Sequence, residues 1–303
     1  MPYPEDFYTG NTARHSLQLA CTNGQSSLAG GAYVTLEHGD VRYYVLGPED
    51  GQKVIVLVHG LQWPCTVWEE VVKDLVQRGY RVLVYDNYGR GYSDGPDVTN
   101  DMALYTEQLR QLLAHLNWTD IFLAGYSMGG AIAVAFTEEY PSLVRRLVLV
   151  APAGLIGSVA RSSDSIAASK GARTGEMPFI GRIAQHPLLL RILMGAIVAR
   201  EPVASIIAYQ MAHCPSTVRA IGLSLRDFPF HALHATYQAV GHLVHIPAIV
   251  FWGTKDEMVP YADAALLPVY MPHAKLVTID HGTHGIVRSH HDLIMNALDD
   301  FLK

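Results

Sequence analysis

Residues 121–130 of this chain read IFLAGYSMGG, and the rest of the predicted architecture can be arranged around this turn. The apolar residues before Gly125 predict a short buried strand, and the residues after Ser127 predict a helix that ends at Pro141. A strand that turns abruptly into a helix forces its central residue into a strained backbone conformation, so the neighbouring residues must be small. Gly125 and Gly129 meet that need, and we expect Ser127 to project above the carboxyl edge of a sheet.

Short β-rich runs alternate with helical patterns on both sides of this turn, which is typical of a largely parallel sheet. The first two runs, separated by His38-Gly39-Asp40, predict a hairpin. Gly79 is well placed to end an amphipathic helix in the left-handed conformation. The expected strands lie at residues 32–37, 41–46, 54–58, 81–85, 121–124, 147–150, 248–252 and 275–279.

The alternating pattern stops at Pro152, and residues 155–243 show helical apolar patterns without a convincing strand. Strand and helix patterns then resume and continue to the last helix of the chain. We therefore predict one α/β domain with a helical segment inserted into it. Its first part covers residues 1–154, the insert covers residues 155–244, and the second part covers residues 245–303.

Composition excludes several other classes of protein. Half of the 303 residues are apolar, and the net charge of −6 argues against a protein that binds nucleic acid through clustered Lys and Arg. The three cysteines lie far apart without CxxC spacing, so neither a disulfide framework nor a cysteine zinc site is expected. The sequence shows neither a signal peptide nor an apolar run long enough for a membrane span, which predicts a cytoplasmic location. It does not indicate an oligomeric state.

A serine hydroxyl becomes a good nucleophile only when a base takes its proton, so the candidate bases are the histidines near the same sheet edge. His284 follows the expected strand 275–279 in a glycine-containing loop, which would bring it to the rim that carries Ser127. His281 lies in the same loop and is the alternative base.

The base in turn needs a carboxylate that orients its ring and stabilises the imidazolium. Asp256 leaves the expected strand 248–252 through a glycine turn and is the preferred candidate. Asp280 lies at a strand end, and Asp263 is expected to be a solvated helix residue. The predicted catalytic residues, Ser127, Asp256 and His284, then follow one another in the nucleophile–acid–base chain order associated with such a turn.

Acyl transfer also needs donors for the oxyanion that develops on the attacked carbonyl. The backbone N–H groups of Leu61 and Met128 form the expected pair, because Leu61 follows a buried strand and His59-Gly60, and Met128 follows the nucleophile. The candidates for residues that line the substrate pocket are Gln62, Trp63 and Tyr126.

These pieces together resemble the α/β-hydrolase superfamily and, within it, the capped serine hydrolases and esterases. The matching motifs are His59-Gly60-Leu61, the loop 86–94, the turn 125–130, residues 253–256 and Gly282-Thr283-His284. The resemblance implies an α/β-hydrolase fold, in which a mostly parallel eight-stranded sheet is flanked by helices and a helical cap is inserted after the sixth strand. It also implies that Arg90 and Asp94 have structural roles.

The departures from family patterns narrow the expected chemistry. Ser127 stands where the epoxide hydrolases and haloalkane dehalogenases of this fold have an aspartate, so those two reactions are not expected. The chain also lacks a His-Gly-Gly-Gly run, which argues against the hormone-sensitive-lipase-like subgroup. Gly285 follows His284, whereas the meta-cleavage C–C hydrolases usually have a tryptophan there.

We expect a serine hydrolase that cleaves a carboxylic ester, lactone or thioester of a small, neutral, hydrophobic molecule without a cofactor or a metal. The alternatives are a C–C bond hydrolase or an acyltransferase that uses the same residues, or a ligand-binding protein of this fold without activity.

Overall fold

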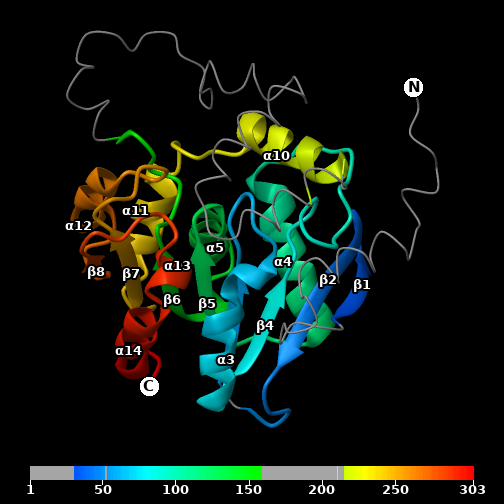
Figure 1. The fold of residues 1–303 in the computed structure, drawn as a ribbon, viewed down its shortest axis with the longest axis horizontal. Helices are drawn as coiled ribbons and strands as arrows, with labels where there is room; N and C mark the ends of the chain where they lie inside the picture. The colour runs from blue at the N-terminus through cyan, green and yellow to red at the C-terminus, as the bar shows by residue number, and fades with distance from the viewer. Residues whose placement is uncertain (1–30, 52, 159–209, 211–214) are drawn as a thin grey trace.

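The computed structural model describes residues 31–51, 53–158, 210 and 215–303, and within them a central sheet carries helices on both faces (Figure 1). The strands are β1 (Ala32–Leu36), β2 (Gly39–Leu46), β3 (Val54–Val58), β4 (Arg81–Tyr85), β5 (Ile121–Tyr126), β6 (Val144–Val150), β7 (Ala248–Gly253) and β8 (Lys275–Ile279). The helices are α3 (Glu69–Gln77), α4 (Met102–Leu116), α5 (Met128–Glu139), α10 (Pro215–Asp227), α11 (His234–His242), α12 (Leu267–Tyr270), α13 (Ile286–Ser289) and α14 (His291–Phe301). Short 3-10 helices cover Cys65–Trp68, Pro141–Leu143 and Tyr261–Leu266.

The eight strands form one sheet in the order β1-β2-β4-β3-β5-β6-β7-β8. β1 and β2 form the expected antiparallel hairpin, in which Leu36 pairs with Gly39, and β2 also runs antiparallel to β4. Every other neighbouring pair of strands is parallel. The predicted α/β-hydrolase fold with its mostly parallel eight-stranded sheet is therefore confirmed.

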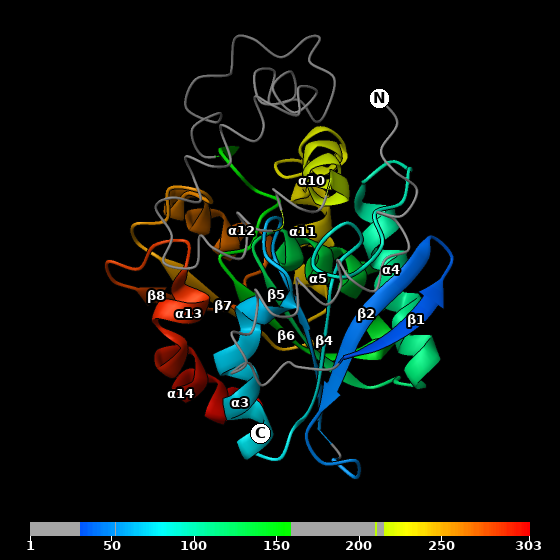
Figure 2. The same cartoon turned by 45° about the vertical axis from the view of Figure 1, so that its right-hand side comes forward.

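The sheet separates two hydrophobic cores because successive side chains of a strand point to opposite faces. In β3, Val56 and Val58 belong to one core, while Ile55 and Leu57 belong to the other. Residues of α4, α5 and α11 complete the first core, and residues of α3, α13 and α14 complete the second (Figure 2). Both faces of the central strands are therefore covered, which explains their continuous apolar sequences.

Several helix ends follow directly from the sequence. The Asp101 side chain accepts a hydrogen bond from the Leu104 N–H at 3.1 Å and caps α4, and Asn117 ends this helix in the left-handed conformation. Gly79 has φ +81° just after α3, as predicted. Other boundaries differ: β6 begins at Val144 rather than at residue 147, because Val144 and Arg146 already pair with β5.

The helical insert predicted for residues 155–244 is described only in part. α10 and α11 lie within this range, and α11 packs against α5. Residues 159–209 and 211–214 lie outside the described residues, so the boundaries of the predicted cap remain an expectation. In the described ranges, none of the helices combines the length and the apolar character that crossing a membrane requires.

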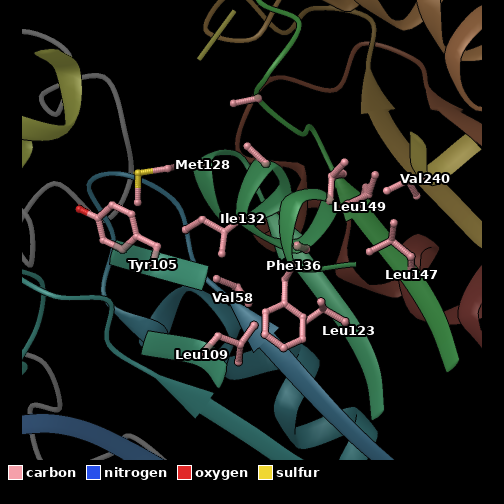
Figure 3. Packing of buried hydrophobic residues seen from close by; sticks show 14 of the residues in the cluster. Val58, Tyr105, Leu109, Leu123, Met128, Ile132, Phe136, Leu147, Leu149 and Val240 are labelled. Atoms are coloured by element: carbon pink, nitrogen blue, oxygen red, sulfur yellow. The ribbon is translucent and has the colours of Figure 1, made fainter. Parts of the chain in front are cut away.

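We predict that Leu149→Ala lowers the free energy of unfolding by about 2–5 kcal/mol, because this fully buried β6 side chain lies in the first core (Figure 3). Leu293→Ala is the control, since this α14 side chain is 41% exposed and its loss should cost no more than about 0.5 kcal/mol. Urea unfolding of both variants measures the difference. Equal losses would contradict the assignment of Leu149 to a packed core.

Candidate active site

Three loops at the carboxyl edge of the sheet carry the predicted catalytic residues. Ser127 follows β5, Asp256 follows β7 and His284 follows β8. β5, β6, β7 and β8 are consecutive parallel strands, so their carboxyl ends meet at one edge of the sheet. The fold therefore brings these residues together although Ser127 and His284 are 157 positions apart.

The three side chains form a continuous hydrogen-bonded chain. Ser127 Oγ lies 2.9 Å from His284 Nε2, and His284 Nδ1 lies 2.8 Å from Asp256 Oδ2. His284 and Asp256 are both buried, whereas Ser127 is partly exposed. This is the arrangement in which a carboxylate fixes one tautomer of the imidazole and the other ring nitrogen faces the serine.

Neighbouring groups hold the carboxylate and the imidazole in place. Asp256 Oδ1 accepts the N–H groups of Met258 at 3.0 Å and Val259 at 2.9 Å, which leaves Oδ2 directed at His284. The Tyr126 ring lies 5.1 Å from the His284 ring, and the Tyr126 hydroxyl donates to the His284 carbonyl at 3.2 Å. Tyr126 therefore holds His284 in place. That Tyr126 also lines the substrate pocket stays a prediction.

The alternative candidates lie elsewhere. His281 and Asp280 are 81% and 80% exposed, and they pair with each other at 3.4 Å. The expectation that Asp263 is solvated is wrong. Its side chain is buried, and its carboxylate accepts the Gly157 N–H at 2.8 Å, because the chain that leaves β6 passes directly over it.

The backbone around Ser127 explains the glycines of the turn. Ser127 has φ +56°, in the region that disfavours side chains with a Cβ. A Cβ on Gly125 would lie 2.2 Å from the Gly129 carbonyl oxygen, and a Cβ on Gly129 would lie 2.2 Å from the Val58 carbonyl oxygen. Neither position tolerates another residue without movement of the backbone.

The loop after β3 lies against the serine. A Cβ on Gly60 would be 3.1 Å from the Ser127 Cβ, so the Gly60–Leu61 peptide is next to the nucleophile position. Within the described part of the chain, neither the Leu61 nor the Met128 N–H donates to a backbone carbonyl. Both amides are therefore free of backbone partners there, as donors for an oxyanion should be. The Met128 side chain is fully buried in the first core (Figure 3).

The other two pocket candidates are nearly enclosed. Gln62 is 8% exposed and Trp63 is 9% exposed. The Arg288 guanidinium lies over the Trp63 ring at 5.8 Å from its centroid, which ties this loop to α13.

His59 has a structural role that the sequence did not reveal. Its Nδ1 lies 2.8 Å from the Gly60 carbonyl oxygen, and its Nε2 accepts the Asn87 N–H at 2.8 Å. Complete burial lowers the pKa of His59 to about 3, so the ring stays neutral at neutral pH. The neutral ring joins the loop after β3 to the loop after β4. Its position after a buried strand suggested only a turn.

Arg90 was predicted to be structural, but its contacts could not be foreseen. The fully buried guanidinium donates to the Leu61 carbonyl at 3.0 Å, to the Tyr105 hydroxyl at 2.6 Å and to Ser224 Oγ at 2.7 Å. It also donates to the Tyr88 carbonyl at 2.8 Å. One side chain therefore connects the loop that carries Leu61 with α4 and with α10 of the predicted cap.

One group of potential metal ligands occurs among the described residues, and it lies away from Ser127. The ligand atoms of Asp74, His291 and Asp292 are within 4.8 Å of one another on α3 and α14, with Asp292 exposed. Nothing connects this surface group with the chain of hydrogen bonds at Ser127.

Comparison with known proteins agrees with this architecture. The family described as "Serine aminopeptidase, S33" matches residues 49–290. The solved structure of the enol-lactonase of Burkholderia xenovorans is similar to this chain, with a TM-score of 0.72 and 20% sequence identity. The aligned region covers 89% of this chain and 99% of the enol-lactonase chain. The protein is thus an α/β hydrolase. More narrowly, the chain belongs to the serine aminopeptidase S33 family of hydrolases.

Two relatives cover most of the chain. An uncharacterised protein of Mycobacterium tuberculosis is 29% identical over 251 residues, which are 76% of this chain and 69% of that protein. A cis-3-alkyl-4-alkyloxetan-2-one decarboxylase of Xanthomonas campestris is 30% identical over 275 residues, which are 85% of this chain and 90% of that enzyme.

The burial of His59 predicts how stability depends on pH. The folded-state pKa of about 3 lies below the ordinary histidine pKa of 6.5, so between these pH values the unfolded chain binds an extra proton. This contribution to stability is complete above about pH 6.5 and is lost as the pH falls towards 3. In His59→Gln, the free energy of unfolding should therefore change less steeply between pH 4 and 6, by up to about 1.4 kcal/mol per pH unit. Urea unfolding at several pH values tests this, and parallel curves for the two proteins would contradict it.

Proposed function

We propose that this protein is a serine hydrolase that cleaves a carboxylic ester, lactone or thioester through an acyl-enzyme on Ser127. The observation that carries the proposal is the chain of hydrogen bonds from Ser127 Oγ through His284 to Asp256, at 2.9 Å and 2.8 Å. The Leu61 and Met128 amides beside it, which have no backbone acceptor among the described residues, support the same chemistry. A ligand-binding protein would need none of these groups in this alignment.

In the first half-reaction, Ser127 Oγ attacks the substrate carbonyl carbon while its proton passes to His284 Nε2. The carbonyl oxygen becomes negatively charged, and the Leu61 and Met128 N–H groups donate to it. Such a donor is typically worth about 3–4 kcal/mol in the transition state. When the tetrahedral intermediate collapses, the bond to the leaving group breaks, and His284 returns the proton to the departing alcohol or thiol.

In the second half-reaction, a water molecule takes the place of the leaving group. His284 accepts a proton from this water, whose oxygen attacks the acyl carbon of the ester on Ser127. The intermediate then expels Ser127 Oγ, which regains its proton from His284, and the carboxylic acid leaves. Asp256 acts through His284 in both halves, because its carboxylate orients the ring and stabilises the imidazolium.

The proposed substrate is small, neutral and hydrophobic. Leu61 offers a partly exposed apolar side chain on the loop after β3, and a charged acyl group would lose its hydration against such a surface. The names of the Xanthomonas relative and of the Burkholderia enzyme each mention a cyclic ester, which is an oxetan-2-one in the first name and an enol lactone in the second. Lactones therefore belong in the first substrate panel beside open-chain esters.

Ser127→Ala should lower kcat/KM for an ester substrate by ~10³-fold or more, because no other group can replace the attacking oxygen. His284→Ala should cause a similar loss. His281→Ala is the matched control in the same loop, and it should keep activity within a fewfold of the unchanged protein. Retention of more than a tenth of the activity by Ser127→Ala would overturn the assignment.

A fluorophosphonate probe distinguishes a hydrolase from a binding protein of this fold. The proposal requires stoichiometric labelling at Ser127, read out by peptide mass spectrometry. Failure of the folded protein to label would favour a non-catalytic protein. Turnover of a vinylogous diketone without ester hydrolysis would instead favour a C–C hydrolase on the same residues.

Activity should rise with the length of a straight acyl chain. Each methylene that is buried in an apolar pocket adds up to ~0.8 kcal/mol of binding until the pocket is filled. Across p-nitrophenyl esters, kcat/KM should therefore increase from acetate to at least butyrate or hexanoate. Preference for acetate, or for a dicarboxylic acyl group, would contradict the substrate class while leaving the roles of Ser127 and His284 intact.

A further inference from the structure

A depression lies at the amino edge of the sheet, opposite the edge that carries Ser127. Its volume is about 350 Å³. The residues that line it include Lys53 before β3, Arg145 and Arg146 near the start of β6, and Lys303 after α14. Figure 1 shows that the C-terminal end of α14 and the α10 end of the molecule are far apart. The depression is therefore separate from the candidate active site.

Positive charge is concentrated at this depression although the whole chain has a net charge of −6. Arg145 pairs with Asp120 at 3.0 Å, and Lys303 pairs with Asp300 at 2.7 Å. Both of these pairs are well exposed, so each contributes little to stability and can yield to a ligand.

The remaining two cations are held by neutral groups. Lys53 Nζ donates to the Leu302 carbonyl at 3.3 Å and lies 5.7 Å from the Tyr80 ring centroid. The Arg146 guanidinium stacks on the Phe301 ring at 5.5 Å. In the described part of the chain, no carboxylate lies within 4.0 Å of either cation. The described residues therefore give neither Lys53 nor Arg146 a close ion-pair partner.

Arg146 also has an unsatisfied donor. Its Nε is shielded from water and has no hydrogen-bond partner among the described groups. Because this Nε is shielded, an oxyanion in the depression would bond the terminal nitrogens of the Arg146 guanidinium, whose planar fork matches the oxygens of phosphate.

We propose that this depression is a binding site for a small molecule that carries a phosphate group. The cations Lys53 and Arg146 would hold the phosphate, while the apolar side chains of Phe122 and Pro247 leave room for a carbon group on it. The volume lies at the lower end of the range for small-molecule sites, which suits a phosphomonoester or inorganic phosphate rather than a macromolecule.

The test is titration calorimetry on the whole protein with inorganic phosphate and with phenyl phosphate, each at constant ionic strength against chloride. Saturable binding with a Kd of about 1 mM or lower is expected. Lys53→Gln and Arg146→Gln should each weaken it by about tenfold or more, the loss of one charged hydrogen bond. Arg110→Gln on α4 is the control, because this exposed arginine pairs with Glu107 away from the depression, and it should leave the Kd unchanged.

The two ligands separate the sources of the phosphate group. Tighter binding of phenyl phosphate identifies a phosphomonoester as the ligand class, and equal binding identifies phosphate alone. Heats no larger than those of chloride, or equal affinities in Lys53→Gln and the unchanged protein, would overturn the proposal. Binding to phosphatidylserine vesicles without binding of either soluble phosphate would also overturn it. None of these measurements depends on hydrolytic turnover.

Discussion

The contact on which the site depends is the one between the first turn of α5 and the end of β3. Because Gly129 has no side chain, the helix approaches until a Cβ there would lie 2.2 Å from the Val58 carbonyl oxygen. This approach forces Ser127 to φ +56° and brings Gly60 next to it, where a Cβ would be 3.1 Å from the serine Cβ. One close backbone contact therefore places the partly exposed Ser127 hydroxyl beside the Met128 and Leu61 amides. The strain at Ser127 is sustained by the two packed cores on either side of the sheet.

Two buried side chains stabilise the loop that follows β3, one as a neutral imidazole and the other as a charged guanidinium. His59 is kept neutral by burial, which lowers its pKa to about 3, and it joins this loop to Asn87 through its ring nitrogens. Arg90 instead places a guanidinium among neutral oxygens, including those of Leu61 and Ser224. Removing any of these acceptors leaves a buried donor unsatisfied, which costs about 1–3 kcal/mol or more. The loop after β3 and α10 are therefore energetically coupled through Arg90.

Features set by local sequence could be predicted, whereas features set by long-range packing could not. The strands, the turn at Ser127 and the positions of Asp256 and His284 follow from apolar runs, glycines and strand ends. The burial of Asp263 depends on the distant Gly157, and the contacts of Arg90 depend on Ser224, which is 134 positions away. Neither the periodicity of apolar residues nor the spacing of motifs indicates which distant residues will be in contact. The start of β6 at Val144 was missed because Arg145 and Arg146 interrupt the apolar run that marks the rest of the strand.

The strand order has a consequence for the protein while it is being made. The strands that flank Ser127 in the sheet, β3, β5 and β6, have all been made once the chain has passed residue 150. His284 emerges 157 residues after Ser127, a delay of roughly 10–30 s at ordinary rates of synthesis. One edge of β6 stays unpaired until β7 has been made, and Ser127 lacks its imidazole neighbour until residue 284 has been made. A chain that ends before β8 therefore lacks the imidazole that lies against Ser127 Oγ, so the hydrogen-bonded chain of three side chains can assemble only once the last strand and its loop have been made.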